Sequence, residues 1–221
     1  ECAVGRPKVS YREAITHRVR GEAKIVKEVN GRGQFAHIVF EMFPREPGSG
    51  FSFESTVNGG TIPSEYFKAI EAGFKQAVDS GWVAGYPMVD VGFELLDGTH
   101  HEVDSSDVAF KAAAMQGFRN TVANAAAHIL EPIMALEVVV PDENLGDVIG
   151  DINSRRGRVS ALEARGAVQT IRADVPLAEM FGYATDLRSK SQGRATYTMQ
   201  FSRFEPVPKP VGDQIVTGAR G

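Results

Sequence analysis

The hydrophobic and polar positions of the first half of the chain predict a sheet covered by two helices. Runs with the alternation or apolar character of strands cover residues 9–29 (two strands, interrupted near His17 and Gly21), 34–43, 51–57 and 87–96. Apolar positions that recur on one helical face cover residues 64–79 and 106–129. We therefore predict an α+β domain over residues 9–130.

The second half of the chain arranges strands and helices in a different order. Its predicted strands are residues 133–140, 157–163, 167–175 and 194–204, and its predicted helices are residues 142–154 and 177–189. The order βαββαβ is the plan of ferredoxin-like domains. We expect Glu131-Pro132 to break the chain between the two domains. The second domain, residues 131–221, would end in a tail rich in proline and glycine, with QIVTGAR as a short closing helix.

A tight turn is predicted at Asn30-Gly31, between two extended runs. Asn and Gly both accept the positive φ of a two-residue hairpin loop, so this pair is a strong hairpin signal. The tip then presents Arg32 between Gly31 and Gly33, a cation on a backbone that can approach a phosphate closely. The alternative is an ordinary solubilising turn.

A second loop carries His100 and His101 and joins a predicted strand to a predicted helix. Rigid elements on both sides would hold the two histidines at an end of the domain, where a ligand can meet them. The alternative is a surface loop that happens to contain histidines. The residues that can cap the following helix are Asp104, Ser105 and Ser106.

The sequence gives little support for a catalytic site or a metal-binding site in this chain. The five histidines and single cysteine show no metal-ligand spacing, and adjacent histidines on a loop are a poor two-ligand geometry. His101, Asp104 and Ser105 are the residue types of a hydrolase triad, but closeness in sequence does not establish triad geometry, and Ser105 suits a helix cap better. Neither G-x-x-x-x-G-K-[ST] nor G-x-G-x-x-G is present. We expect no catalytic residue, metal or cofactor in this chain.

The net charge of −4 is unevenly distributed. Residues 1–37 hold eight Lys and Arg against four Asp and Glu, residues 151–194 hold eight against five, and residues 38–150 hold five against seventeen. Two basic segments could face phosphate while an acidic body stays away from it. Arg155, Arg156 and Arg158 follow a predicted helix and could bind RNA phosphate. The alternative is that these cations complement the helix dipole.

Targeting signals are weak. No apolar run reaches the roughly 18 residues that cross a membrane, and residues 1–10 lack the apolar core of a signal peptide. Cys2 is the single cysteine, which excludes an internal disulfide and suits a reducing compartment. We expect a cytoplasmic protein with no membrane partner, and we expect residues 1–8 to be the end of a preceding domain and a linker.

Several motifs together resemble the C-terminal part of bacterial translation elongation factor G. They are GRGQFAH (31–37), GTHHEVDSSDVAFKAA (98–113), LEPIM (130–134), GDVIGDINSRRGRV (146–159) and VPLAEMFGYATDLRSKSQGRATYTMQF (175–201). The resemblance covers nearly the whole chain in order. It implies that residues 1–8 end the third domain, that residues 9–130 form the fourth domain with a ribosomal-protein S5-like fold, and that the ferredoxin-like fifth domain follows.

The resemblance also implies roles. The fourth domain would enter the decoding region of the small ribosomal subunit and contact tRNA and mRNA, with His101 and the loop Gly31, Arg32, Gly33 and Gln34 at its tip. His101 would be unmodified, and the role of His100 stays open. Arg155, Arg156 and Arg158 would contact rRNA. The parent would be a monomeric GTPase that binds GTP and Mg²⁺ in an N-terminal domain that this sequence lacks.

Other functions stay open. A related translational GTPase could serve ribosome recycling or displace tetracycline. A small-molecule kinase can use the S5-like fold, but it requires a glycine-rich phosphate loop. A bare RNA-binding module is the third alternative.

Overall fold

The computed structural model describes residues 8–219, so most of the expectation for residues 1–8 lies outside the described residues. The chain divides into two compact units. We call residues 12–129 together with the described residues from 207 onward the first unit, and residues 130–206 together with the described residues up to Tyr11 the second unit. The tail, which the sequence placed with the second domain, is grouped by its contacts with the first unit.

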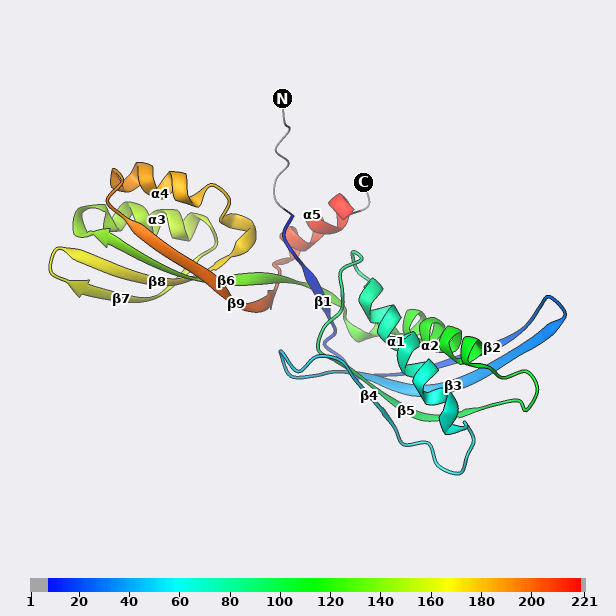
Figure 1. Ribbon diagram of the computed structural model, residues 1–221. Helices are drawn as coiled ribbons and strands as arrows, with labels where there is room; N and C mark the ends of the chain where they lie inside the picture. Colours follow the sequence, from blue (N-terminus) through cyan, green and yellow to red (C-terminus); the bar gives the residue numbers. More distant parts are fainter. Residues whose placement is uncertain (1–7, 220–221) are drawn as a thin grey trace. The chain divides into compact units, whose positions relative to one another are not determined.

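The first unit contains a four-stranded sheet covered on one face by two helices (Figure 1). Neighbouring strands follow the order β2-β3-β5-β4, and only β4 and β5 are parallel. Phe74 stacks on Phe93 with ring centroids 4.2 Å apart and also contacts Phe40, which joins a helix to the sheet in the core. The elements are β1 (Arg12–Ala14), β2 (Val19–Val29), β3 (Arg32–Pro44), β4 (Ser52–Ser55), α1 (Phe67–Ser80), β5 (Val91–Thr99), α2 (Asp107–Thr121) and α5 (Lys209–Ala219).

The hairpin prediction at Asn30-Gly31 is confirmed. Both residues have positive φ, 52° and 74°, and Val29 pairs directly with Arg32 across the two-residue loop. The predicted interruption within residues 9–29 is confirmed near His17, which lies between β1 and β2, but it is wrong at Gly21, because β2 runs through that residue. A Cβ at Gly21 would lie 2.3 Å from Thr121 Oγ1, so this glycine lets α2 approach the strand closely rather than ending it.

The second predicted helix is shorter than expected. α2 ends at Thr121 rather than at residue 129, and a 3₁₀ turn (Val122–Ala125) follows it. Ala126 then adopts φ 53°, which turns the chain before β6 (His128–Pro141) begins. The apolar positions near residue 129 therefore belong to a buried strand, which a run of apolar residues alone does not distinguish from a helix.

The second unit has the ferredoxin-like order predicted from the sequence. Its strands are ordered β9-β6-β8-β7, all neighbouring pairs are antiparallel, and α3 and α4 cover one face (Figure 1). Leu136, Val138 and Ile171 of the sheet are buried in one core together with Val148 and Ile152 of α3. The elements after β6 are α3 (Leu145–Ser154), β7 (Arg158–Arg165), β8 (Val168–Pro176), α4 (Tyr183–Ser191) and β9 (Thr196–Pro206).

The predicted chain break at Glu131-Pro132 is wrong, because β6 continues through both residues. Pro132 pairs with Phe204 of β9, whereas pairing with β8 begins only at Ile133. A bulge follows between Ile133 and Met134. Proline lacks a backbone N–H and is tolerated within a strand at a bulge.

Candidate functional site

The hairpin loop and the histidine loop meet in one surface, which we call the tip and define as residues 29–34 and 99–106. The backbone N–H of Phe35 donates to the carbonyl oxygen of Asp104 at 2.9 Å, and Ser105 Oγ donates to the carbonyl oxygen of Phe35 at 2.8 Å. These bonds join the start of β3 to the loop before α2. The sequence predicted each loop separately, and the structure brings them together.

The ring of His101 is oriented by backbone groups of its own loop. Its Nδ1 accepts hydrogen bonds from the N–H groups of Val103 (3.3 Å) and Asp104 (3.2 Å). A neutral imidazole whose Nδ1 accepts carries its proton on Nε2. The side chain is 55% exposed, and no partner of Nε2 is found among residues 8–219. His101 therefore offers a hydrogen-bond donor to a ligand.

Ser105 is not the helix cap that the sequence suggested. Its Oγ accepts from the backbone N–H of His101 at 2.9 Å, and Ser106 Oγ caps α2 by accepting from the N–H of Ala109 at 3.2 Å. The triad of His101, Asp104 and Ser105 does not form, since the imidazole bonds to backbone N–H groups rather than to the Ser105 hydroxyl. Ser105 instead links the histidine loop to the start of β3, because its hydroxyl bonds to both His101 and Phe35.

A third segment, which the sequence analysis did not single out, lies beside the tip. His100 Nδ1 is 2.9 Å from the carbonyl oxygen of Thr61, in the loop that follows β4. Thr61 Oγ1 donates to Asp97 at 3.3 Å, and the next residue, Ile62, is buried so close to Gly98 that a Cβ there would lie 2.5 Å from Ile62 Cδ1. The sequence Asn58-Gly59-Gly60 is typical of a turn, but no pattern in the neighbouring residues indicates that this turn lies beside His100.

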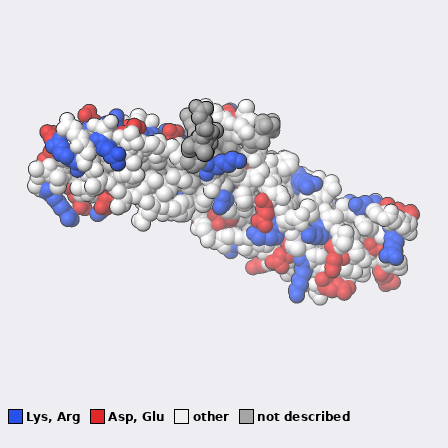
Figure 2. All heavy atoms as spheres, turned by 45° about the horizontal axis from the view of Figure 1, so that its top comes forward, with Lys and Arg blue, Asp and Glu red and all other residues white. Residues whose placement is uncertain are grey.

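The tip carries cations and carboxylates together. Arg32 is exposed at the start of β3, Gln34 is half-buried beside it, and Lys24 Nζ lies 5.6 Å from the ring centroid of Phe35. Glu102 and Asp104 contribute negative charge to the same surface. Figure 2 likewise shows basic and acidic side chains interspersed over the visible surface. The charge split along the sequence therefore does not become one basic face in that view.

Arg155 lies inside the second unit rather than on its surface. Its guanidinium donates to Asp151 at 3.0 Å, to the carbonyl oxygen of Glu179 at 2.6 Å and to Asp186, and it lies 5.1 Å from the ring centroid of Tyr183. The side chain is 11% exposed. Its charge therefore holds α3 and α4 together, and its predicted rRNA contact stays a prediction.

Arg156 also turns inward. It follows the end of α3 in the left-handed conformation (φ 58°), where helices more often place glycine. Its guanidinium makes a bidentate pair with the buried carboxylate of Glu131, at 2.7 and 2.9 Å, and the hydrogen bond with Glu131 is the main reason that the pKa of Arg156 is raised. Arg158 differs, because its side chain is 68% exposed although it bonds to Glu205 at 3.0 Å.

Comparison with known proteins connects these features to a family. The model of elongation factor G domain IV matches residues 7–126, and the model of the elongation factor G C-terminus matches residues 128–215. The chain belongs to the elongation factor G family. A crystal structure of a protein from Thermus thermophilus is similar, with a TM-score of 0.88 and 38% identity over 98% of this chain. The chain spans 32% of that protein.

The family matches confirm the predicted α+β class and its two folds in order, an S5-like domain and a ferredoxin-like domain. They place the tip in elongation factor G domain IV and the three arginines in the elongation factor G C-terminus. The individual contacts predicted for these residues remain predictions.

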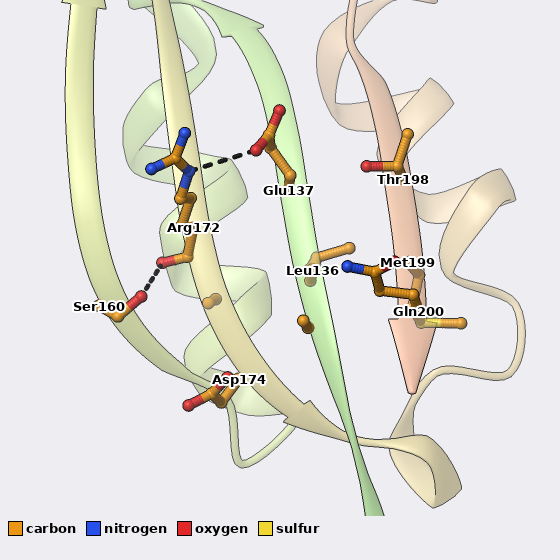
Figure 3. A pocket seen from close by; sticks show the side chains of 10 residues that line it. Leu136, Glu137, Ser160, Arg172, Asp174, Thr198, Met199 and Gln200 are labelled. Carbon is orange, nitrogen blue, oxygen red and sulfur yellow. Dashed lines mark hydrogen bonds and ion pairs between the residues drawn. The ribbon is translucent and has the colours of Figure 1, made fainter. Parts of the chain in front are cut away.

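The elongation factor G C-terminus of this chain also has a shallow hollow of about 410 Å³ on the sheet face opposite its helices (Figure 3). Its charged lining is paired internally, with Arg172 Nε 3.2 Å from Glu137 and Asp174 bonded to Arg203. Within residues 8–219 no group of three His, Cys, Asp or Glu side chains is arranged to hold a metal ion, and no helix is long and apolar enough to span a membrane.

Proposed function

We propose that this chain is the C-terminal part of a ribosomal translocase, which promotes GTP-dependent movement of tRNA and mRNA during protein synthesis. The observation that carries this proposal is the oriented, exposed His101 on a tip built from two loops that are bonded to each other. The partners are the ribosome, tRNA and mRNA, and the protein acts as a monomer in the cytoplasm.

The proposed mechanism uses occupancy and hydrogen bonding rather than bond chemistry. Domain IV enters the decoding region, where the tip lies beside the codon and the anticodon. His101 Nε2–H donates to RNA, and Arg32 and the glycines beside it, which have no side chain to hold a ligand away, approach the phosphate backbone. Bound there, the tip weakens existing ribosomal contacts and blocks return of the tRNA–mRNA complex.

A tip of this kind must hold its shape. The bonds among Phe35, Asp104 and Ser105 are 2.8–2.9 Å long and join two loops that are far apart in sequence, and α2 is capped directly behind them by Ser106. Such preorganisation reduces the side-chain and loop ordering that binding would otherwise require. This is why we assign function to the histidine loop.

The second unit contributes rRNA contacts in this proposal. Arg158 is the exposed member of the predicted arginine cluster and is available to phosphate if it exchanges its pair with Glu205. Arg155 and Arg156 act through Asp151, Asp186 and Glu131, by fixing the turn between α3 and β7, the strand that begins at Arg158.

GTP and Mg²⁺ belong to another part of the longer protein in this proposal. The sequence offers GTP no G-x-x-x-x-G-K-[ST] loop, and its residues do not fit the nucleotide. We therefore route no step of the mechanism through GTP in this chain.

The test is single-round translocation on purified ribosomes. Residues 1–221 replace the matching part of a well-characterised elongation factor G. Rapid GTP-dependent movement of tRNA and mRNA is the expected result. If the chimera hydrolyses GTP on ribosomes but splits subunits with recycling factor instead of moving tRNA, the recycling alternative is correct and translocation is not the function.

A further inference from the structure

We propose that His100 is a second RNA-contacting residue of the tip, which accepts a hydrogen bond from a ribose 2′-hydroxyl group while His101 donates one. The inference rests on the proposed function of the tip. The two adjacent histidines would then offer opposite hydrogen-bonding groups on their Nε2 atoms.

The polarity of His100 follows from its contact with Thr61. A carbonyl oxygen has no proton, so the 2.9 Å contact between His100 Nδ1 and the Thr61 oxygen requires Nδ1 to donate. In the neutral ring Nε2 is then an acceptor. No partner of this nitrogen is found in the described part of the chain.

The opposite polarity of His101 follows from two N–H groups. Backbone N–H groups can only donate, so Val103 and Asp104 make Nδ1 of His101 an acceptor and leave the proton on Nε2. The Asp104 carboxylate lies 3.5 Å from the same Nδ1, farther than either N–H group. Two consecutive side chains are thus set to different tautomers by the backbone around them.

The Thr61 carbonyl is itself held in place. The Thr61 hydroxyl donates a hydrogen bond to Asp97. The side chain of the next residue, Ile62, is only 2% exposed and packs against Gly98. A displaced loop would lose both contacts together with the His100 bond. The orientation of the His100 ring is therefore set by the packed core beneath β5, and not by the tip loop alone.

The chemistry of RNA identifies the partner. An acceptor nitrogen cannot bind phosphate oxygens, which are acceptors too. Base amino and imino donors are used in codon–anticodon pairing, and those that remain exposed depend on the sequence. The 2′-hydroxyl is present on every ribose and lines the minor groove of an RNA duplex, where it can both donate and accept. A factor that acts on every codon needs such a sequence-independent group.

The tautomers can be tested on this chain without ribosomes. Uniform ¹⁵N labelling and long-range proton–nitrogen correlation separate protonated from unprotonated ring nitrogens, and single His→Gln variants assign each of the five histidines. We expect the proton on Nδ1 in His100 and on Nε2 in His101 at a pH about one unit above the ordinary histidine pKa. The same tautomer in both rings, or two protonated nitrogens in His101, would overturn the proposal.

The contact is tested in the translocating chimera. His100→Asn keeps an amide N–H near the position of Nδ1 but removes the Nε2 acceptor, and His100→Gln can place an oxygen near Nε2. Loss of one hydrogen bond corresponds to about a tenfold slower step, so we expect His100→Asn to slow translocation by that factor and His100→Gln to slow it less. Unchanged Thr61 amide shifts in His100→Asn would show that the loop is intact.

Chemically modified messenger RNA can identify the group that donates the hydrogen bond to His100. Messenger RNAs with single 2′-deoxy substitutions in the codon should slow the unsubstituted chimera at one position and leave His100→Asn unaffected there. Equal sensitivity of both proteins at every position would refute the 2′-hydroxyl contact. A chimera that never translocates would refute the proposed function instead, while the tautomer measurement would still stand.

Discussion

Gly33 lies directly against the carboxyl group of Asp104, so that a Cβ on Gly33 would be 2.5 Å from Asp104 Cγ. The two residues are far apart in sequence, and they mark the place where the hairpin loop meets the histidine loop. The residue at position 33 is therefore limited by contact with the other loop rather than by backbone conformation. This contact can be measured.

Gly33→Ala should destabilise the first unit by at most about 1 kcal/mol, because the added methyl group displaces the partly exposed end of the Asp104 side chain and no core atom. Urea unfolding followed by fluorescence of Trp82, the single tryptophan, reports on this unit. The control is a double-mutant cycle with Asp104→Ala. If Gly33→Ala costs the same in both backgrounds, the two loops are not coupled through this contact.

His101→Ala in the full-length chimera should slow translocation by about tenfold or more while ribosome-stimulated GTP hydrolysis stays largely intact. The reason is that the substitution removes one oriented donor from the tip and leaves the nucleotide-binding part of the protein unchanged. Rapid-mixing measurements of the two activities in parallel decide this. Equal loss of both activities would argue against a role confined to the tip.

The arginines of the second unit should separate into two classes. Arg156→Ala leaves the buried Glu131 carboxylate unpaired and should cost about 3–5 kcal/mol. Arg158→Ala removes a surface ion pair and should cost at most about 1 kcal/mol. Circular dichroism during urea unfolding measures both, and equal costs for the two variants would contradict this division.

Ribosome binding gives the complementary result for these arginines. Arg158→Glu should weaken binding and reduce its dependence on salt, because a phosphate contact is lost from a folded domain. Binding by Arg158→Glu that equals that of the unsubstituted protein across a salt series would remove Arg158 from the interface. Arg165→Glu, on the exposed end of β7, is the matched control for a change of charge alone.

Tyr183 should make the second unit sensitive to alkali. Burial raises the pKa of its hydroxyl, which has no hydrogen-bond partner within the described chain. Because the folded-state pKa lies above the ordinary value of about 10, the contribution of this group to stability is complete below that ordinary value. It is lost as the pH rises further, since the unfolded state then releases its proton more readily.

Tyr183→Phe should therefore abolish this alkaline loss and leave stability at neutral pH unchanged or increased by about 1 kcal/mol. Methyl NMR signals of the second unit during urea unfolding, at neutral pH and about one unit above the ordinary tyrosine pKa, provide the measurement. A Tyr183→Phe variant that loses several kcal/mol at neutral pH would contradict this account.

Most of the helices and strands, and the βαββαβ order, can be predicted from the sequence alone. Asn30-Gly31 determined the hairpin because its two residues accept positive φ, and the alternation of strand and helix periods determined the second fold. Predictions from the sequence are wrong where tertiary contacts override a local signal. Gly21 continues a strand because α2 packs against it, and Pro132 continues one because it lies where β8 no longer pairs.

The chemistry of the candidate site, by contrast, depends on tertiary contacts. The sequence grouped Arg155, Arg156 and Arg158 as three neighbouring cations. In the structure Arg155 pairs with Asp151 and Arg156 pairs with Glu131, and both carboxylates are largely buried. These pairs form because α3 packs beside α4 and β6. The sequence also marked His100 and His101 without distinguishing them. Their tautomers depend on a carbonyl 39 residues away and on two local N–H groups, since hydrogen-bond polarity is set by atoms that meet in space.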